Sequence, residues 1–178
     1  MSRANHAVRV RAATRDDIPG IIRVATTSVT DEELEGFGGP CEESPFRDAG
    51  RLSAVWVDPN LVGSEELHVA EAGSQVVGLV TLERRGRELE LVDIDVLGSR
   101  QGQGIGTAMV AYVEEMARRD GMGAVTLGTS RSADGVPWKS FGWWRSLGYA
   151  VTHEEENEWT RSIGPGAREI RMRKDLAR

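Results

Sequence analysis

The chain has 178 residues, of which 39% are hydrophobic and 28% are charged, and its net charge is −6 at pH 7. This length and composition are typical of one globular domain with a sizeable core, so we expect a single domain over residues 1–178 with flexible ends at 1–7 and 176–178. No apolar run approaches the roughly 20 residues of a membrane helix, and the first residues lack an apolar signal segment. We therefore expect a cytoplasmic protein with no membrane partner, and its acidic charge argues against a nucleic-acid partner.

The single cysteine, Cys41, excludes an internal disulfide framework and a cysteine-based metal site. Its neighbours Glu42 and Glu43 disfavour the thiolate that a nucleophile requires, so we expect Cys41 only to pack. The three histidines are scattered without metal-ligand spacing; they are His6, His68 and His153. The sequence therefore predicts no metal site.

In chain order, the first element is a strand at 8–13. A helix follows, because Thr14 and Asp17 three residues later resemble a capping box. Its apolar stripe has helical spacing and ends at the Gly36–Pro40 cluster; the stripe consists of Ile18, Ile21, Ile22, Ala25 and Val29. A second helix is expected over 45–58, ended by Asp58-Pro59-Asn60.

From Glu66 onward the strand and helix patterns are stronger. They predict strands at 66–72, 75–84 and 88–96, a long helix from 105 to about Asp120, a strand at 124–128, a helix at 136–147, and strands at 148–154 and 168–174. Residues 159–167, with Gly164-Pro165-Gly166, are expected to be mobile. The predicted fold class is mixed α/β around one sheet.

A glycine-rich turn joins the strand at 88–96 to the long helix: Gln101-Gly102-Gln103-Gly104-Ile105-Gly106-Thr107. The first amides of a helix have no intrahelical partner and the helix dipole adds positive charge, so such a turn binds phosphate without a lysine. Glycine lets the backbone approach the ligand closely. Glycines also serve ordinary turns, so the spacing alone leaves a purely structural role open.

Two other phosphate motifs fit poorly. A P-loop requires a lysine after its last glycine, whereas Gly106 is followed directly by Thr107. A dinucleotide fold places its glycine turn after the first strand, with an acidic residue about 20 residues further on. Here several strands precede the turn, and the next strand ends in Gly128-Thr129.

The turn does match the Gln/Arg-x-x-Gly-x-Gly/Ala pattern of the coenzyme A pyrophosphate loop in GNAT-type N-acetyltransferases. Leu67–Gly73 and Val76–Leu82 resemble the hairpin that precedes the cofactor strand in that family, and Phe141–Tyr149 is similar to its late helix. The three segments follow the family order within residues 8–175. The resemblance implies a single central, mostly antiparallel sheet of about six to seven strands, splayed between strands four and five and flanked by about four helices.

The resemblance also implies acetyl-CoA as co-substrate and assigns the cofactor contacts. Val96 is expected to pair with the pantetheine arm, and the pyrophosphate contacts are expected from Gln101, Gly102, Gln103, Gly104, Ile105, Gly106 and Thr107. Strand alternation places Val92, Ile94 and Val96 on a core face and Asp93 and Asp95 on the other face.

A primary amine is mostly protonated at neutral pH, so its attack on a thioester requires a base. Asp93 and Asp95 are the predicted catalytic residues, with Glu90 in reserve. Alternatively, these carboxylates only bind a cationic substrate or cap the separated strands.

The family usually offers a tyrosine on the late helix to protonate the departing thiolate, but this chain has Trp144 there. Indole is not a useful acid, so solvent or Tyr149 takes the role, or transfer has been lost. The leading prediction is an N-acetyltransferase that acts on a primary amine of a small, cationic molecule or peptide by direct attack in a ternary complex. The alternative is an inactive module that binds acyl-CoA or a partner, and a homodimer is possible by analogy with the family.

Two acidic runs are expected to border the acceptor cleft, where they would attract a cationic acceptor. They consist of Asp31, Glu32, Glu33, Glu35, Glu42 and Glu43, and of Glu154, Glu155, Glu156 and Glu158. Trp138, Trp143, Trp144 and Trp159 are the aromatic residues expected nearby. Runs of charged residues more often form solvent-exposed faces than binding sites, and tryptophans on a helix more often belong to the core than to a binding cleft.

Overall fold

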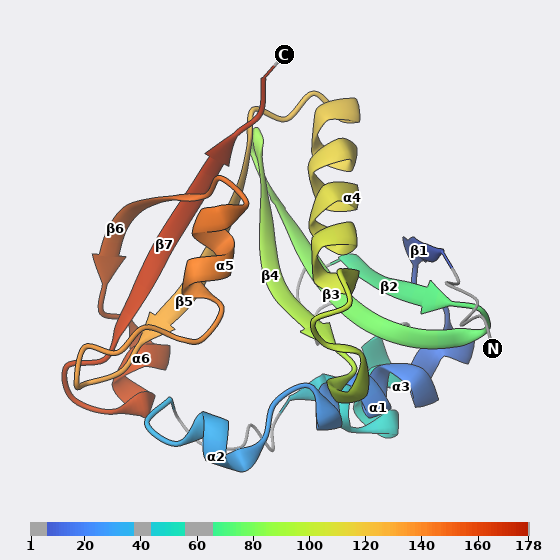
Figure 1. Cartoon of the computed structure of the whole chain (residues 1–178), viewed down its shortest axis with the longest axis horizontal. Helices are drawn as coiled ribbons and strands as arrows, with labels where there is room; N and C mark the ends of the chain where they lie inside the picture. The colour runs from blue at the N-terminus through green and yellow to red at the C-terminus, as the bar shows by residue number, and fades with distance from the viewer. Residues whose placement is uncertain (1–6, 38–43, 56–65, 178) are drawn as a thin grey trace. The chain divides into compact units, whose positions relative to one another are not determined.

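The structure is a computed structural model that describes residues 7–37, 44–55 and 66–177. Three sequence predictions lie outside these residues: the packing of Cys41, the place of Glu42 and Glu43 beside the acceptor cleft, and the helix end at Asp58-Pro59-Asn60. The elements follow one another along the chain as in Figure 1.

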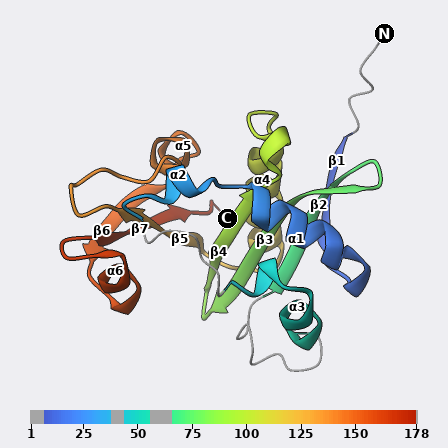
Figure 2. The same cartoon turned by 90° about the horizontal axis from the view of Figure 1, so that it is seen from below.

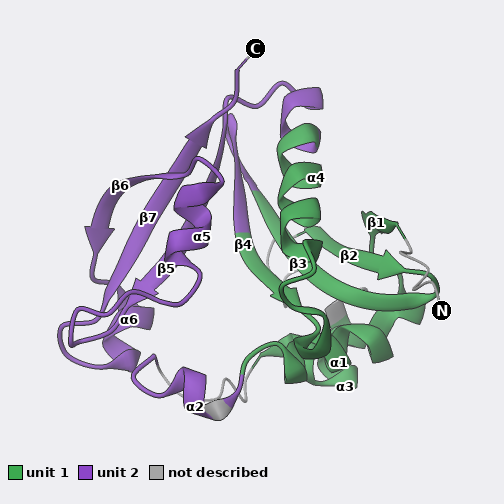
Figure 3. Cartoon of the chain, in the orientation of Figure 1, with its two compact units in different colours: residues 1–29, 42–83, 92–115 green, residues 30–41, 84–91, 116–178 purple. Residues whose placement is uncertain are grey.

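The chain forms two compact units (Figure 3). Unit one comprises residues 1–29, 42–83 and 92–115, and unit two comprises residues 30–41, 84–91 and 116–178. Strand β4 (Glu88–Val96) and helix α4 (Ile105–Arg119) each contribute to both units.

Unit one contains an antiparallel meander of strands β1 (Val8–Ala12), β2 (Glu66–Ala72) and β3 (Gln75–Arg85). Helices α3 (Ala49–Val55) and α4 lie on opposite sides of these strands in Figure 2, and α1 (Ile18–Thr27) packs beside α3. The core consists of fully buried aliphatic side chains from these elements, among them Ile21, Val24, Leu52, Val69, Leu79 and Met109.

The start of α1 shows the predicted cap. Asp17 accepts a hydrogen bond from the Thr14 amide at 2.7 Å, which stabilises a 3-10 turn at Arg15–Asp17 before the helix. Of the predicted stripe, Ile21 and Ala25 are buried, whereas Ile18, Ile22 and Val29 are only half-buried.

Unit two contains strands β5 (Ala124–Arg131), β6 (Ala150–Glu155) and β7 (Arg168–Asp175) with the start of β4. Strand β5 pairs parallel with β4 from Glu88↔Ala124 to Leu91↔Leu127 and antiparallel with β7 along its whole length. Helices α5 (Phe141–Ser146) and α6 (Glu158–Ile163) lie on opposite sides of these strands in Figure 2.

The strand order β1-β2-β3-β4-β5-β7-β6 confirms the predicted mixed α/β fold class with one sheet. The β4–β5 ladder has four residue pairs and ends at Leu91↔Leu127, whereas β4 continues to Val96 and β5 to Arg131. The fourth and fifth strands are therefore paired at one end only, as the predicted splay requires.

Several element boundaries differ from the prediction. The described residues contain six α-helices, because short helices form at α2 (Asp31–Leu34) and α6. Helix α6 overlaps the segment 159–167 that was predicted to be mobile, and Asn157 caps this helix by accepting from the Thr160 amide at 2.9 Å.

The expected helix at 45–58 is instead a 3-10 turn, Pro45–Arg47, followed by α3. The side chain of Asp48 separates the two by accepting from the Arg51 amide at 2.7 Å. The expected helix at 136–147 shortens to α5, because Pro137 forms a bridge with Arg131. None of the helices in the described ranges is long and apolar enough to cross a membrane.

Candidate active site

Hydrogen bonds within unit one hold the turn after β4 in place. The Leu97 amide donates to the Val77 carbonyl at 2.9 Å, and a 3-10 turn follows at Gly98–Arg100. The Gly98 amide donates to the Thr27 hydroxyl at the end of α1, at 3.4 Å. These contacts hold the start of the glycine-rich turn in place between β4 and α4.

The side chain of Gln101 also stabilises this turn. Its amide nitrogen Nε2 donates to the Ser28 carbonyl at 2.5 Å and to the Val96 carbonyl at 3.3 Å. This side chain therefore connects the turn to the end of α1 and the end of β4, and the backbone amide of Gln101 donates to the Gly98 carbonyl at 3.4 Å.

Two glycines give the turn its shape. Gly102 and Gly104 have φ values of 73° and 80°, in the left-handed region that disfavours other residues. A Cβ built on either would meet no atom within 4 Å, so the space beside this backbone is open. The side chain of Gln103 folds back on the turn, where its Nε2 donates to the Ser99 carbonyl at 3.3 Å.

Helix α4 begins directly after these glycines. The Ala108 amide donates to the Gly104 carbonyl at 3.0 Å, so the amides of Ile105, Gly106 and Thr107 belong to the first turn. The side chain of Ile105 is 4% exposed and anchors that turn in the core. Open backbone and first-turn amides together form a cradle suited to an anionic group such as a diphosphate.

The predicted catalytic carboxylates lie on the same strand as Val96. Asp93 is exposed, and its backbone amide donates to the Thr81 hydroxyl at 3.1 Å; Asp95 and Val96 are half-buried. The prediction that Val92, Ile94 and Val96 form a core face is wrong, because all three are only half-buried. The register explains this, since the ladder between β4 and β5 ends at Leu91.

In unit two, Trp144 is a core residue with 3% exposure. Its ring lies edge-on to Tyr149, with 5.4 Å between the centroids, and 4.4 Å from the ring of Trp143. Tyr149 is also buried, and the Lys174 ammonium lies 5.7 Å from its ring centroid. The aromatic residues at the end of α5 thus serve packing.

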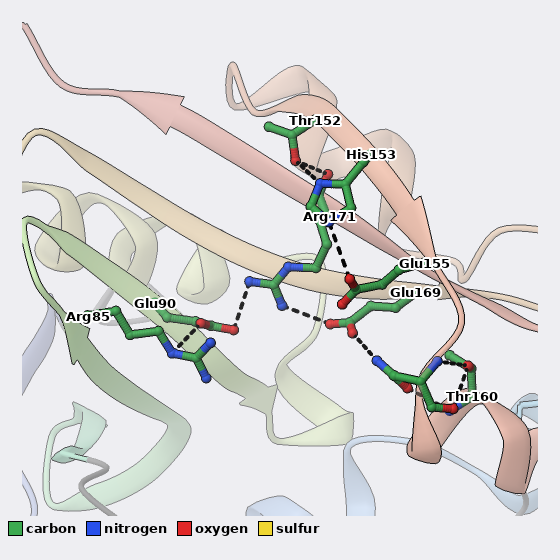
Figure 4. Close-up of polar contacts among 9 residues, drawn as sticks. Arg85, Glu90, Thr152, His153, Glu155, Thr160, Glu169 and Arg171 are labelled. Atoms are coloured by element: carbon green, nitrogen blue, oxygen red, sulfur yellow. Dashed lines mark hydrogen bonds and ion pairs between the residues drawn. The ribbon is translucent and has the colours of Figure 1, made fainter.

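Glu90, the reserve base of the sequence prediction, lies in a buried ion-pair network (Figure 4). Its carboxylate is 2.9 Å from Arg85 Nε and 3.0 Å from Arg171 Nη2. Arg171 also donates to Glu169 at 2.8 Å. Burial opposes the charged form of Arg171, but these two carboxylates raise its pKa above the ordinary value. The network depends on strand register, which the sequence did not indicate.

The acidic runs are partly neutralised by cations of the chain itself. Glu33 lies 2.5 Å from Lys139, and this hydrogen bond is the main cause that lowers the pKa of the Glu33 carboxyl. Further along the chain, Glu154 and Glu156 pair with Arg131 and Arg161 at 2.8 and 3.9 Å. These pairs weaken the long-range field on which attraction of a cationic acceptor would depend.

Trp138 is also engaged within unit two. Its ring lies 4.9 Å from the ring of Phe37, edge-on, and the Lys139 ammonium lies 5.6 Å from its centroid. Over the described ranges, no group of three or more His, Cys, Asp or Glu side chains is placed to hold a metal ion.

The comparisons with known proteins agree with this fold. Residues 26–136, more than half of the chain, match the model of the acetyltransferase (GNAT) family. No curated protein sequence matches the chain significantly.

Three solved structures share the fold. Ard1 from Thermoplasma volcanium is 17% identical with a TM-score of 0.68, covering 97% of this chain and 99% of its own. The PaiA N-acetyltransferase from Thermoplasma acidophilum, in complex with coenzyme A, is 18% identical with a TM-score of 0.67, covering 95% and 99%. The ribosomal-protein-S18-alanine N-acetyltransferase from Escherichia coli is 13% identical with a TM-score of 0.68, covering 97% and 96%.

Proposed function

Since the chain belongs to the GNAT family of acetyltransferases, we propose that it transfers the acetyl group of acetyl-CoA to the primary amine of a small molecule or peptide. The observation that carries this proposal is the cradle formed by the turn after β4 and the first turn of α4. Acetyl-CoA supplies the activated thioester, and the chain binds it and handles the proton of the amine.

The cradle holds the diphosphate of coenzyme A through backbone amides of residues 102–107, and the side chain of Gln101 supports the turn. The left-handed glycines support this assignment, because they leave open space where side chains would otherwise stand. Arg100 lies in the 3-10 turn that leads into the cradle, and its Nη1 donates to Gln103 at 3.4 Å, so it adds a positive charge beside the diphosphate. Val96 aligns the pantetheine arm through its backbone.

The acceptor must lose a proton before it attacks, and Asp93 or Asp95 takes that proton, directly or through a water. The free amine then attacks the thioester carbonyl, the tetrahedral intermediate loses a second amine proton to solvent and expels the thiolate of coenzyme A, and the resulting amide is released. Because Trp144 offers no acidic proton, solvent protonates the thiolate.

The acceptor is a primary amine. A cationic acceptor fits the net charge of −6, although the ion pairs of Glu33, Glu154 and Glu156 reduce the field available for it. Solved structures of the same fold include an enzyme named for the alanine of ribosomal protein S18, which keeps peptide amines among the acceptors to test.

A second function is favoured by one observation, the buried indole of Trp144: a module that binds acyl-CoA without transferring the acyl group. The two functions are separated by measuring the release of free coenzyme A thiol from acetyl-CoA with polyamines, aminoglycosides and short peptides. Transfer predicts amine-dependent thiol release with at least one acceptor. Binding of acetyl-CoA without thiol release for any amine would favour the module.

A further inference from the structure

Unit two carries a pocket on the same face of its strands as the network of Glu90. Its volume is about 490 Å³, open solvent included, and its lining is rich in charged side chains of both signs. The lining residues that matter here are Arg85, Glu88, Glu90, Thr126, Arg171 and Arg173. None of these has a role in the proposed acetyl transfer.

The base of the pocket is rigid. The side chains of Glu90 and Arg171 are 7% and 18% exposed, and Glu169 holds Arg171 from the other side (Figure 4). Asn157, the cap of α6, donates to Glu169 at 2.5 Å. A Cβ at Gly128 would collide with the Glu169 carboxylate, so only glycine at this position of β5 lets the carboxylate lie across the strand.

Two partly exposed charged side chains lie at the opening of the pocket. Glu88 and Arg173 are 39% and 35% exposed and form a direct ion pair, and Arg173 Nε also lies 2.8 Å from the Asp175 carboxylate. The register aligns Glu90, Thr126 and Arg173 on the adjacent strands β4, β5 and β7. Since neighbouring strands lie about 4.8 Å apart, the carboxylate-bearing and guanidinium-bearing strands are separated by about 10 Å, with a hydroxyl between them.

This charge pattern selects one class of ligand. A simple anion would meet the carboxylates of Glu88 and Glu90, and a simple cation would meet the guanidinium groups of Arg85, Arg171 and Arg173. A molecule with one ammonium and one carboxylate group satisfies both. The backbones of β4 and β7 lie about 10 Å apart, so a short zwitterion fits between the side chains of Glu88 and Arg173, with a hydrogen bond at each end, once their direct ion pair opens.

We propose that this pocket binds a small zwitterion, a free α-amino acid, with its carboxylate on Arg173, its ammonium on Glu88 and the Thr126 hydroxyl beneath it. The ligand replaces the exposed Glu88–Arg173 pair with two new ion pairs, and an exposed pair of this kind adds little to stability, so opening it costs little. The site lies within unit two and does not depend on the proposed acetyl transfer.

The test is titration of the full-length protein, without acetyl-CoA, with the common α-amino acids, followed by nuclear magnetic resonance or calorimetry. Methylammonium and acetate serve as half-ligands. At least one amino acid should bind saturably, and each half-ligand should bind at least about tenfold more weakly, because it makes only one of the two ion pairs.

Variants then locate the site. Glu88→Gln and Arg173→Gln should each weaken binding about 10- to 100-fold, the loss expected for a charge-assisted contact. Thr126→Val keeps both charges and should weaken binding by a smaller factor. Glu156→Gln is the matched control, because it removes another exposed ion pair of unit two, at 3.9 Å from Arg161, and should leave binding unchanged.

The proposal is overturned if no amino acid binds the wild-type chain, or if acetate or methylammonium alone binds as tightly as the best amino acid. It is also overturned if the folded Glu88, Arg173 and Thr126 variants all retain wild-type affinity. Thermal unfolding of each variant shows whether it is folded, and the Thr126 variant, which changes no charge, keeps the test decisive if a charge variant does not fold.

Discussion

Replacement of Gly106 by valine separates the binding role of the glycine-rich turn from its structural role. Gly106 is the second residue of α4 and, unlike Gly102 and Gly104, does not have a positive φ. Valine can therefore adopt its backbone conformation. A branched side chain at this position stands over the first-turn amides that we assign to the diphosphate.

We expect Gly106→Val to keep or raise the stability of the fold and to lower its affinity for acetyl-CoA. Valine is a better helix former than glycine by about 0.5 kcal/mol, so Gly106→Val should leave the free energy of unfolding unchanged or slightly higher. Loss of two charge-assisted hydrogen bonds to phosphate, at about 1.5–3 kcal/mol each, removes about 3–6 kcal/mol of binding free energy. The affinity for acetyl-CoA should then fall by at least about 100-fold.

The chain offers a matched control in Gly142. It is the second residue of α5, it is exposed, and a Cβ there would meet no atom within 4 Å. Gly142→Val should leave acetyl-CoA binding unchanged. Calorimetry gives both affinities, and acetyl-pantetheine, which lacks the diphosphate, should bind the Gly106 variant and the wild type equally.

Two results would refute the reasoning. If Gly106→Val binds acetyl-CoA with wild-type affinity, the amides of this turn do not hold the diphosphate. If the variant loses acetyl-CoA and acetyl-pantetheine in equal proportion while remaining folded, the side chain acts on the thioester end of the ligand rather than on the diphosphate.

Three further predictions concern catalysis and stability. Asp93→Asn and Asp95→Asn should lower the rate of thiol release, most strongly at low pH where the acceptor is protonated; unchanged pH profiles for both would place the base elsewhere. Asp17→Ala should lower the free energy of unfolding by about 1–3 kcal/mol in denaturant titrations at neutral pH, because Asp17 accepts hydrogen bonds of 2.7 and 2.8 Å from Arg11, which is partly exposed and keeps its contact with Glu71. The bond to Arg11 lowers the pKa of Asp17 below its ordinary 3.8, so this contribution is present above pH 3.8 and is lost as the pH falls through the folded pKa; a difference that stays constant into strong acid would contradict the assignment. Trp144→Ala should lower the free energy of unfolding by about 3–5 kcal/mol in denaturant titrations, because the indole is 3% exposed in the core of unit two, and a loss below about 1 kcal/mol would contradict this packing role.

The sequence correctly predicted the strands and helices whose hydrophobic pattern along the chain agrees with their environment in the fold. The strands at 66–72 and 88–96 have the bounds of β2 and β4, because apolar alternation and flanking turns mark both ends. Helix α4 begins at Ile105 as predicted, because the glycines before it and the apolar spacing within it indicate the same boundary.

Short helices escaped prediction because they have too few residues for a periodic pattern. Helix α2 is four residues long and α6 six. The sequence nonetheless contains the capping pairs of both helices. Thr30 and Glu33 are three residues apart at the start of α2, and Asn157 and Thr160 are three residues apart at the start of α6. A cap in the sequence marks the start of a helix even where hydrophobic periodicity cannot.

The roles of individual polar side chains depended on contacts between distant residues. Gln101 was predicted to hold the cofactor, and in the structure its side chain reaches the Ser28 carbonyl, 73 positions earlier in the chain. Glu90 was held in reserve as a base, but strand pairing brings Arg171 to its carboxylate. Neither contact follows from spacing along the sequence, because each is created by packing of separate elements.

The central claim is that the turn from Gln101 to Thr107 holds acetyl-CoA. Calorimetric titration of the purified full-length protein with acetyl-CoA tests this claim most directly. The account predicts saturable binding of one acetyl-CoA per chain with micromolar affinity. Absence of any binding heat across a range of temperatures would contradict it, and would mean that the glycines only shape the turn between β4 and α4.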